Sequence, residues 1–290
     1  MPLRASKKRA ERPGSGHPAR PPKGAELRPV ALLGLPTDVN SSHLRGAALG
    51  PGAIRGALWS GASNLTSETG VDLGLPGALR DEGDLALHEA PADRERIEEA
   101  VADLLGRGFK PLLLGGDHSV TYPIVRAVAA RHAGLSILHF DAHPDLYEEY
   151  EGNRFSHACP FARIMEEGLA KRLVQVGIRT LNVHQAEQAA RFGVEMATMS
   201  AFDADAVRIP EGPLYITIDL DALDPAFAPG VAHREPGGLS VRDLIRVLHR
   251  VKGPVVGADI VELRPASDRD GVTAVVAAKL LKEVAGLLRG

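Results

Sequence analysis

Histidine and aspartate side chains gather in three short segments of this sequence, and each segment follows an apolar run. The segments are GGDHS (115–119), DAHPD (141–145) and DLDALDP (219–225). Imidazole nitrogens and carboxylate oxygens together are typical ligands of divalent transition metals, and the lack of thiolates in these segments argues against a structural zinc site. One such segment alone is more often a solvated loop, but the joint occurrence of all three is hard to obtain by accident.

The number of candidate ligands indicates more than one cation. Carboxylates that share a cleft raise one another's pKa and destabilise the fold, and bound divalent cations remove this conflict. Six ligands exceed the needs of one tetrahedral ion, and a mixed set of imidazole and carboxylate suits Mn²⁺, with Zn²⁺, Ni²⁺, Co²⁺ or Fe²⁺ as alternatives. We therefore predict a binuclear metal site whose ligands are His118, Asp141, His143, Asp145, Asp219 and Asp221.

The three segments can meet only if the elements before them are neighbours in one sheet. Continuous apolar runs predict strands that are covered on both faces, and helical periodicity between them predicts helices, one of them with Ser240 as its N-cap. This alternation favours a parallel sheet, and ligands of such a sheet bind beyond the carboxyl ends of its strands. The predicted strands are 29–36, 109–116, 134–141, 172–179, 213–221 and 254–263, and the predicted helices are 94–107, 122–132, 240–251 and 271–288.

Length and composition suit one α/β domain over residues 29–290. The chain has 290 residues, 44% of them hydrophobic, with a net charge of −3, so neither nucleic acid nor a membrane surface is an expected partner. Residues 1–28 are basic and rich in proline and glycine, which predicts a disordered tail and not a secretory signal. No apolar run reaches the roughly 18 residues of a membrane span. The single Cys159 fits a reducing compartment, and a cytoplasmic location is expected.

Four longer segments resemble the signatures of the ureohydrolase family, which contains the arginases and agmatinases. They are LLGGDHS, FDAHPDL, SHACPFARI and DLDALDPAFAPG, and the resemblance extends over about residues 29–288, closest to the agmatinase and plant-type arginase branch. It implies a three-layer α/β/α fold around a mainly parallel sheet of eight strands, two Mn²⁺ per subunit and a homo-oligomer, a trimer or hexamer. All six ligand positions match the family pattern, with Asp141 and Asp219 as the implied bridging ligands.

The resemblance also implies a reaction, the hydrolysis of a guanidino group to urea and an amine. His157 matches the family's proton-shuttle histidine, Glu262 its guanidinium-contacting glutamate, and Asp145 would also orient the nucleophile. Without the motif, a lone loop histidine is more often structural, and a glutamate at a strand end is more often a surface ion pair. Asp117 and Asp224 are expected to orient the metal ligands through hydrogen bonds.

The far end of the substrate is the part that the sequence determines least. Animal-type arginases use an asparagine and an aspartate to contact the amino-acid end of arginine, and Tyr147 and Asn182 stand in their places here. Their replacement favours agmatine, which would yield putrescine, over arginine; guanidino acids and guanidine are further alternatives. Asn153 and His233 are other candidate substrate contacts, and His139 is expected to be a packed core residue.

Two other functions compete with urea production. One is a related binuclear hydrolase that cleaves a formimino group or another C–N bond. The other is a family member without activity, retained for assembly or ligand binding, and the presence of every ligand together with His157 counts against it. Histone-deacetylase-like enzymes share the fold type but use one zinc ion and lack the pair of DAHPD and DLDALDP segments.

Overall fold

The computed structural model describes residues 29–290, and the predicted basic tail of residues 1–28 lies outside the described residues. Its strands are β1 (Val30–Leu35), β2 (Leu79–Asp84), β3 (Lys110–Gly115), β4 (Ser136–Phe140), β5 (Arg172–Ile178), β6 (Glu195–Thr198), β7 (Leu214–Asp219) and β8 (Val255–Val261). They form one sheet in the order β2-β1-β3-β8-β7-β4-β5-β6. Every pairing is parallel, so the predicted α/β sheet of eight strands is confirmed.

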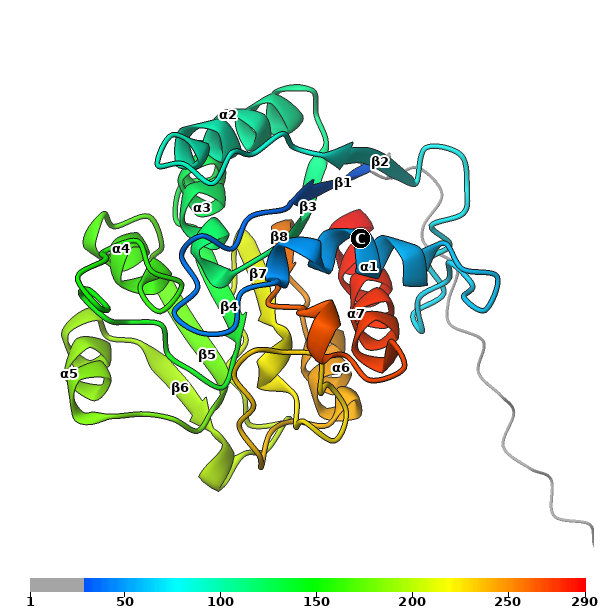
Figure 1. The fold of residues 1–290 in the computed structure, drawn as a ribbon. Helices are drawn as coiled ribbons and strands as arrows, with labels where there is room; N and C mark the ends of the chain where they lie inside the picture. Colours follow the sequence, from blue (N-terminus) through cyan, green and yellow to red (C-terminus); the bar gives the residue numbers. More distant parts are fainter. Residues whose placement is uncertain (1–28) are drawn as a thin grey trace, which may run out of the picture.

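Helices cover both faces of the sheet (Figure 1), and one hydrophobic core lies on each side of it. The helices are α1 (Gly50–Leu58), α2 (Asp93–Gly106), α3 (Thr121–Ala129), α4 (Pro160–Glu166), α5 (Val183–Phe192), α6 (Val241–His249) and α7 (Val272–Arg289). Val30 and Leu32 of β1 point into the core shared with α1, α6 and α7, whereas Ala31 and Leu33 point into the core shared with α2 to α5. Successive strand residues face opposite sides, which produces the three layers.

The two strands that the apolar pattern did not reveal are the edge strands. β2 reads LRDEGD and β6 reads EMAT, and neither has a fully buried residue. An edge strand pairs on one side only and has little need of a continuous apolar run. The six predicted inner strands are all present, so the pattern located the buried part of the sheet and missed its borders.

The four predicted helices are present, and one begins as expected. Ser240 Oγ accepts a hydrogen bond from the backbone N–H of Asp243 at 3.1 Å, and the Asp243 carboxylate accepts one from Ser240 N, which completes a capping box. α1, α4 and α5 were not predicted. No helix in the part of the chain from 29 to 290 is long and apolar enough to cross a membrane.

The sheet order places the chemistry-bearing strand ends side by side. β3, β8, β7 and β4 are consecutive in the sheet, and they lead into GGDHS, Glu262, DLDALDP and DAHPD respectively. Because all four strands run in the same direction, their carboxyl ends lie at one edge, and their loops converge there.

Candidate metal centre

His118 is the central nitrogen ligand candidate of the first group. It is fully buried, and its Nε2 lies 3.0 Å from Thr217 Oγ1. Its Nδ1 lies 3.1 Å from an oxygen of Asp141, 3.1 Å from one of Asp145 and 3.4 Å from one of Asp219. No atom among residues 29–290 makes a well-formed hydrogen bond with this nitrogen. One imidazole N–H could not satisfy three carboxylates in any case.

His143 stands at the centre of a second group. Its Nδ1 lies 3.1 Å from Asp221 Oδ2 and 3.3 Å from Asp141 Oδ1. Asp141 therefore directs one oxygen to each histidine, as a bridging carboxylate would. Backbone donors hold these side chains in place, since Ala142 N donates to Asp221 Oδ1 at 3.1 Å and Asp221 N donates to Asp219 Oδ1 at 2.8 Å. The structure thus brings together all six predicted ligands.

The buried carboxylates of this cluster repel one another, and bound cations would neutralise them. Burial, followed by the charges of Asp221 and Asp141, raises the pKa of Asp219 well above its usual value. Burial raises the pKa of Asp221 to about 6, although the charge of His143 opposes this shift. Burial lowers the pKa of His143, but the negative charge of Asp221 outweighs burial and raises that pKa to about 12. Ligands held at about 2.0–2.2 Å from one ion lie about 3 Å apart, as the His118 and His143 contacts do. The residues present therefore fit a pair of divalent metal sites.

His139 is a site residue that sequence reasoning assigned only to packing. It is fully buried, and its Nε2 lies 2.8 Å from Asp141 Oδ2. The Gln175 amide nitrogen donates to Pro144 O at 2.7 Å and lies 3.0 Å from His139 Nδ1, so Nδ1 accepts and Nε2 donates to Asp141. The imidazole orients the carboxylate. The sequence signal for this role was the position of His139 two residues before Asp141, which places both side chains on the same face of the strand.

Asp117 and Asp224, both expected to orient metal ligands, make different kinds of contact. Asp117 is fully buried and accepts hydrogen bonds from Asn40 N at 2.9 Å and Ser119 N at 3.1 Å, so it organises the turn that carries His118. The half-buried Asp224 accepts hydrogen bonds from the backbone N–H groups of residues 226, 237 and 238. Its contacts brace the loop over residues 224–238 and do not support a role in orienting metal ligands.

His157 and Glu262 form a buried pair next to the ligand cluster. His157 Nδ1 lies 2.8 Å from Glu262 Oε1, which also accepts a hydrogen bond from His118 N at 2.9 Å. His157 Nε2 lies 2.8 Å from Ser42 Oγ and 3.2 Å from Ser42 N; in the neutral form with its proton on Nδ1, Nε2 can accept from Ser42 N. Burial lowers the pKa of His157, but attraction to Glu262 outweighs burial and raises it to about 9.

Two side chains of the site project from strained backbone. Asp145 has φ of 50° and Glu262 has φ of 67°, the left-handed region that residues with a side chain rarely adopt. Such strain persists where the surrounding structure requires it and is found preferentially at functional sites.

A cavity of about 260 Å³ opens above the cluster. Asp145, His157 and Glu262 line it, and so do Tyr147 and Tyr150 from the loop after DAHPD. His233 and Glu235 of the loop that Asp224 braces line it too, as do Ser42, His143, Ala158, Thr180, Gln185, Asp219 and Asp221.

The candidate substrate contacts fall into two groups. His233 lines the cavity, with its ring 5.3 Å from that of His157, and burial lowers its pKa. Asn182 is not a lining residue but donates from its amide nitrogen to the hydroxyl of Tyr147. Asn153 donates to Asn40 Oδ1 at 3.1 Å and is not a lining residue, so its contacts do not support the expected role in binding substrate.

Comparison with known proteins agrees with this geometry. A family model described as the Arginase family matches residues 28–286. The chain belongs to the arginase family. It is 47% identical over 279 residues to mitochondrial arginase 1 of Arabidopsis thaliana, covering 90% of this chain and 82% of that protein. It also resembles the solved arginase of Medicago truncatula, with a TM-score of 0.87 and 43% identity over 91% of this chain and 89% of that one.

Membership establishes the reaction class. The protein is an arginase-type ureohydrolase, a hydrolase that acts on C–N bonds in linear amidines. The expected preference for agmatine is not supported, since a mitochondrial agmatinase of Gallus gallus is 34% identical over 92% of this chain and 83% of that protein, well below the plant arginases. The plant relatives are named mitochondrial, so a cytoplasmic location stays a prediction.

Proposed function

We propose that this enzyme hydrolyses arginine to ornithine and urea and uses two Mn²⁺ ions held by the six ligands described above. The observation that favours arginine over agmatine as the substrate is the hydrogen bond between Asn182 and the Tyr147 hydroxyl. Asn182 Oδ1 accepts from the backbone N–H of Gln185 at 2.9 Å and caps α5, so its amide nitrogen must donate to the Tyr147 hydroxyl. The hydroxyl proton of Tyr147 then has no acceptor anywhere in residues 29–290.

A free hydroxyl proton in the cavity is a donor that suits a substrate carboxylate. Tyr147 is held in place by ring contacts with Tyr150, at 5.1 Å between centroids, and with His184, at 5.5 Å. Arginine has a carboxylate at the end remote from the guanidinium group, and agmatine has none. These two residues therefore support recognition of an amino-acid end by different side chains from those of animal-type arginases.

Acceptors in the same cavity suit the two cationic groups of arginine. Glu262 Oε2 forms no hydrogen bond within the described chain, and it is free to pair with the guanidinium group. Glu235 also lines the cavity, and Arg179 donates two hydrogen bonds to the Glu235 backbone carbonyl, at 2.7 and 3.0 Å. We assign the α-ammonium group of the substrate to Glu235.

Catalysis follows from the groups around the guanidinium carbon. When bound, the two cations would bring the pKa of a water molecule to about 7 and stabilise developing negative charge. Asp145 would orient the attacking oxygen, and Glu262 would hold the guanidinium group in line with it. His157 Nε2, beside Ser42 Oγ, would carry the proton that the leaving amine takes up, because an imidazole can exchange protons near neutral pH.

The test is a substrate panel with the Mn²⁺-loaded enzyme. Urea release from arginine should exceed release from agmatine, guanidinobutyrate and guanidine when compared by kcat/KM. Tyr147→Phe should raise KM for arginine about tenfold, the effect of losing one hydrogen bond to a charged group, and leave KM for agmatine unchanged. A higher kcat/KM for agmatine in the wild type would reject arginine as the preferred substrate, and equal losses for both substrates in Tyr147→Phe would reject the contact between Tyr147 and the arginine carboxylate.

Three coarser expectations complete the proposal. Residues 29–290 would act as one catalytic domain, since all eight strands belong to one sheet. Assembly into a homo-oligomer, a trimer or hexamer, is what the family leads us to expect. Size-exclusion chromatography with light scattering would measure the assembly directly.

A further inference from the structure

Gln185 is a buried side chain of the catalytic cavity that the proposed reaction does not use. It lies in the first turn of α5, is only 3% exposed, and lines the cavity of about 260 Å³ together with Tyr147 and Glu235. Its amide oxygen accepts a hydrogen bond from Leu146 N at 3.2 Å. Because a backbone N–H can only donate, this contact decides which end of the amide is the oxygen. The amide nitrogen, Nε2, is therefore the group left for another partner.

Gln185 Nε2 has no hydrogen-bond partner within residues 29–290, and it still has accessible surface. Seven side-chain atoms of that part of the chain are fully enclosed without a partner, among them Nε2 of Gln188 on the same helix. Gln185 Nε2 is not one of the seven, and the catalytic cavity is the space that its residue lines. An amide nitrogen only donates, so its complement is an acceptor on a bound molecule.

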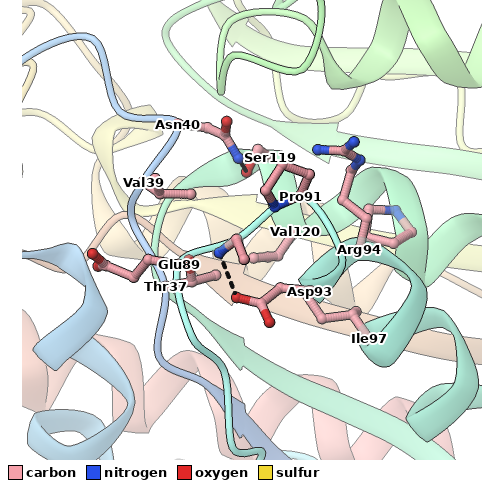
Figure 2. A pocket seen from close by; sticks show the side chains of 12 residues that line it. Thr37, Val39, Asn40, Glu89, Pro91, Asp93, Arg94, Ile97, Ser119 and Val120 are labelled. Atoms are coloured by element: carbon pink, nitrogen blue, oxygen red, sulfur yellow. Dashed lines mark hydrogen bonds between the residues drawn. The ribbon is translucent and has the colours of Figure 1, made fainter.

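Figure 2 shows a smaller cavity, of about 100 Å³, between the segment after β1, the start of α2 and the turn into α3. Its unpaired oxygens, Thr37 Oγ1 and Asp93 Oδ1, are fully enclosed and offer no surface to a ligand. The other oxygen of Asp93 accepts from Ala90 N at 3.1 Å, as drawn, and from His88 N at 2.8 Å. The polar groups of that cavity thus serve the interior of the protein, whereas Gln185 lines a space that a substrate can enter.

The surroundings of Gln185 favour an acceptor with negative charge. The first turn of α5 is the positive end of the helix dipole, and no acidic residue lies in it. Gln185 is itself neutral, so it does not repel a carboxylate. A hydrogen bond from an amide to a carboxylate is roughly twice as strong as one to a neutral acceptor.

Two contacts join Gln185 to Tyr147, the donor assigned above to the substrate carboxylate. Asn182 accepts from Gln185 N at 2.9 Å and donates to the Tyr147 hydroxyl. Leu146, which precedes Tyr147 in the chain, donates to Gln185 Oε1 and closes a ring of contacts. We propose that Gln185 is a specificity-determining residue, which donates from Nε2 to the α-carboxylate of an amino-acid substrate. This role rests on the proposed function, because agmatine has no such group.

An isosteric substitution tests this role. Gln185→Glu keeps an acceptor for Leu146 N, but at pH 8, well above the ordinary glutamate pKa of about 4.3, it replaces the donor by a negative charge. Arginine should lose at least about tenfold in kcat/KM, mainly through KM, because its carboxylate loses a hydrogen bond and faces a like charge. Agmatine, which has an ammonium group at that end, should keep its kcat/KM or gain. The ratio of the two values therefore shifts toward agmatine.

Ala190→Glu is the matched control, because it adds the same charge at an exposed position of α5 that does not line the cavity. Its ratio of arginine to agmatine kcat/KM should stay within about twofold of wild type, since solvent screens exposed charges. If Gln185 only held Leu146 N, Gln185→Glu would leave the ratio unchanged or lower both values equally. Either result would overturn the proposal.

Product binding gives a second measurement that does not depend on turnover. In a crystal of the Mn²⁺-loaded protein soaked with ornithine, a carboxylate oxygen of ornithine should lie within hydrogen-bond distance of Gln185 Nε2. A carboxylate bound elsewhere, with only water at Nε2, would contradict the role of Gln185. A wild-type enzyme that releases no urea from arginine would reject the proposed function. An enzyme active on arginine whose substrate ratio does not change in Gln185→Glu would reject the role of Gln185 alone.

Discussion

The floor and the rim of the catalytic cavity are built in different ways. The floor consists of metal-ligand candidates at the ends of β3, β4 and β7, and Asp141 and His118 there are fully buried. The rim consists of loop residues, among which Tyr147 is half-buried and Asn182 is exposed. Strand ends are held by the sheet, whereas loops can change without disturbing it. The comparison teaches that reaction chemistry and substrate choice belong to separate parts of the molecule.

The largest expected effect is on the floor. Asp141→Ala removes the carboxylate that faces both His118 and His143, so activity should fall below detection and metal content should fall with it. Metal is measured by inductively coupled plasma mass spectrometry after gel filtration. Asp103→Ala, an exposed carboxylate paired with Arg107, is the control and should keep both. Normal metal content in Asp141→Ala would place the site elsewhere.

The second effect separates catalysis from metal binding within the floor. His157→Ala should lower kcat by about 10² to 10⁴, the usual contribution of a general acid, with metal content unchanged. His88→Ala, an exposed histidine, serves as the control and should retain wild-type kcat. If His157→Ala lost metal in proportion to activity, His157 would be structural.

The third effect is a pH dependence of stability in the metal-free protein. Burial lowers the pKa of His157, but Glu262 raises it to about 9, above the value of about 6.5 in an unfolded chain. The protonated form is therefore favoured by folding, and its contribution is complete below about pH 6.5 and is lost as the pH rises through 9. The advantage of wild type over His157→Gln in free energy of unfolding should shrink by about 3 kcal/mol across this range.

Urea denaturation with EDTA present measures this difference. Titrating groups that do not interact with His157 are common to both proteins and cancel, so the comparison measures His157 together with its partners, above all Glu262. A difference that does not vary with pH would show that Glu262 does not hold the proton on His157.

The smallest effect is expected at the rim. Glu235→Gln should raise KM about tenfold for both arginine and agmatine with little change in kcat, because both substrates have an ammonium group at the remote end. Tyr147→Phe, by contrast, should affect arginine alone. A large loss of kcat in Glu235→Gln would mean that this rim residue contributes to the chemistry, and the division between floor and rim would fail.

The metal-ligand candidates of the floor could be located from the sequence because each of them lies in a recognisable local pattern. An apolar run followed by GGDHS, DAHPD or DLDALDP marks a buried strand and its ligands, and the parallel sheet then brings them together. The only sequence signal for the role of His139 was its position two residues before Asp141, and that spacing also fits a packed core residue. The rim left weaker patterns, since residues that interact there are far apart in the chain, as Tyr147 and Asn182 are.

Some contacts could be decided only by the tertiary structure. Asn153 and Asp224 looked suitable for the site, but their hydrogen bonds go to Asn40 and to backbone N–H groups of a loop. The direction of a loop side chain depends on long-range packing, which no local pattern records.

The sequence by itself determined the family, the parallel sheet and the identity of the ligand candidates, because strand periodicity and ligand type are local properties. Only the tertiary structure decided that Asp141 faces two histidines and that Asn182 leaves the Tyr147 proton free. Those are statements about distance and direction between segments, and folding alone sets them.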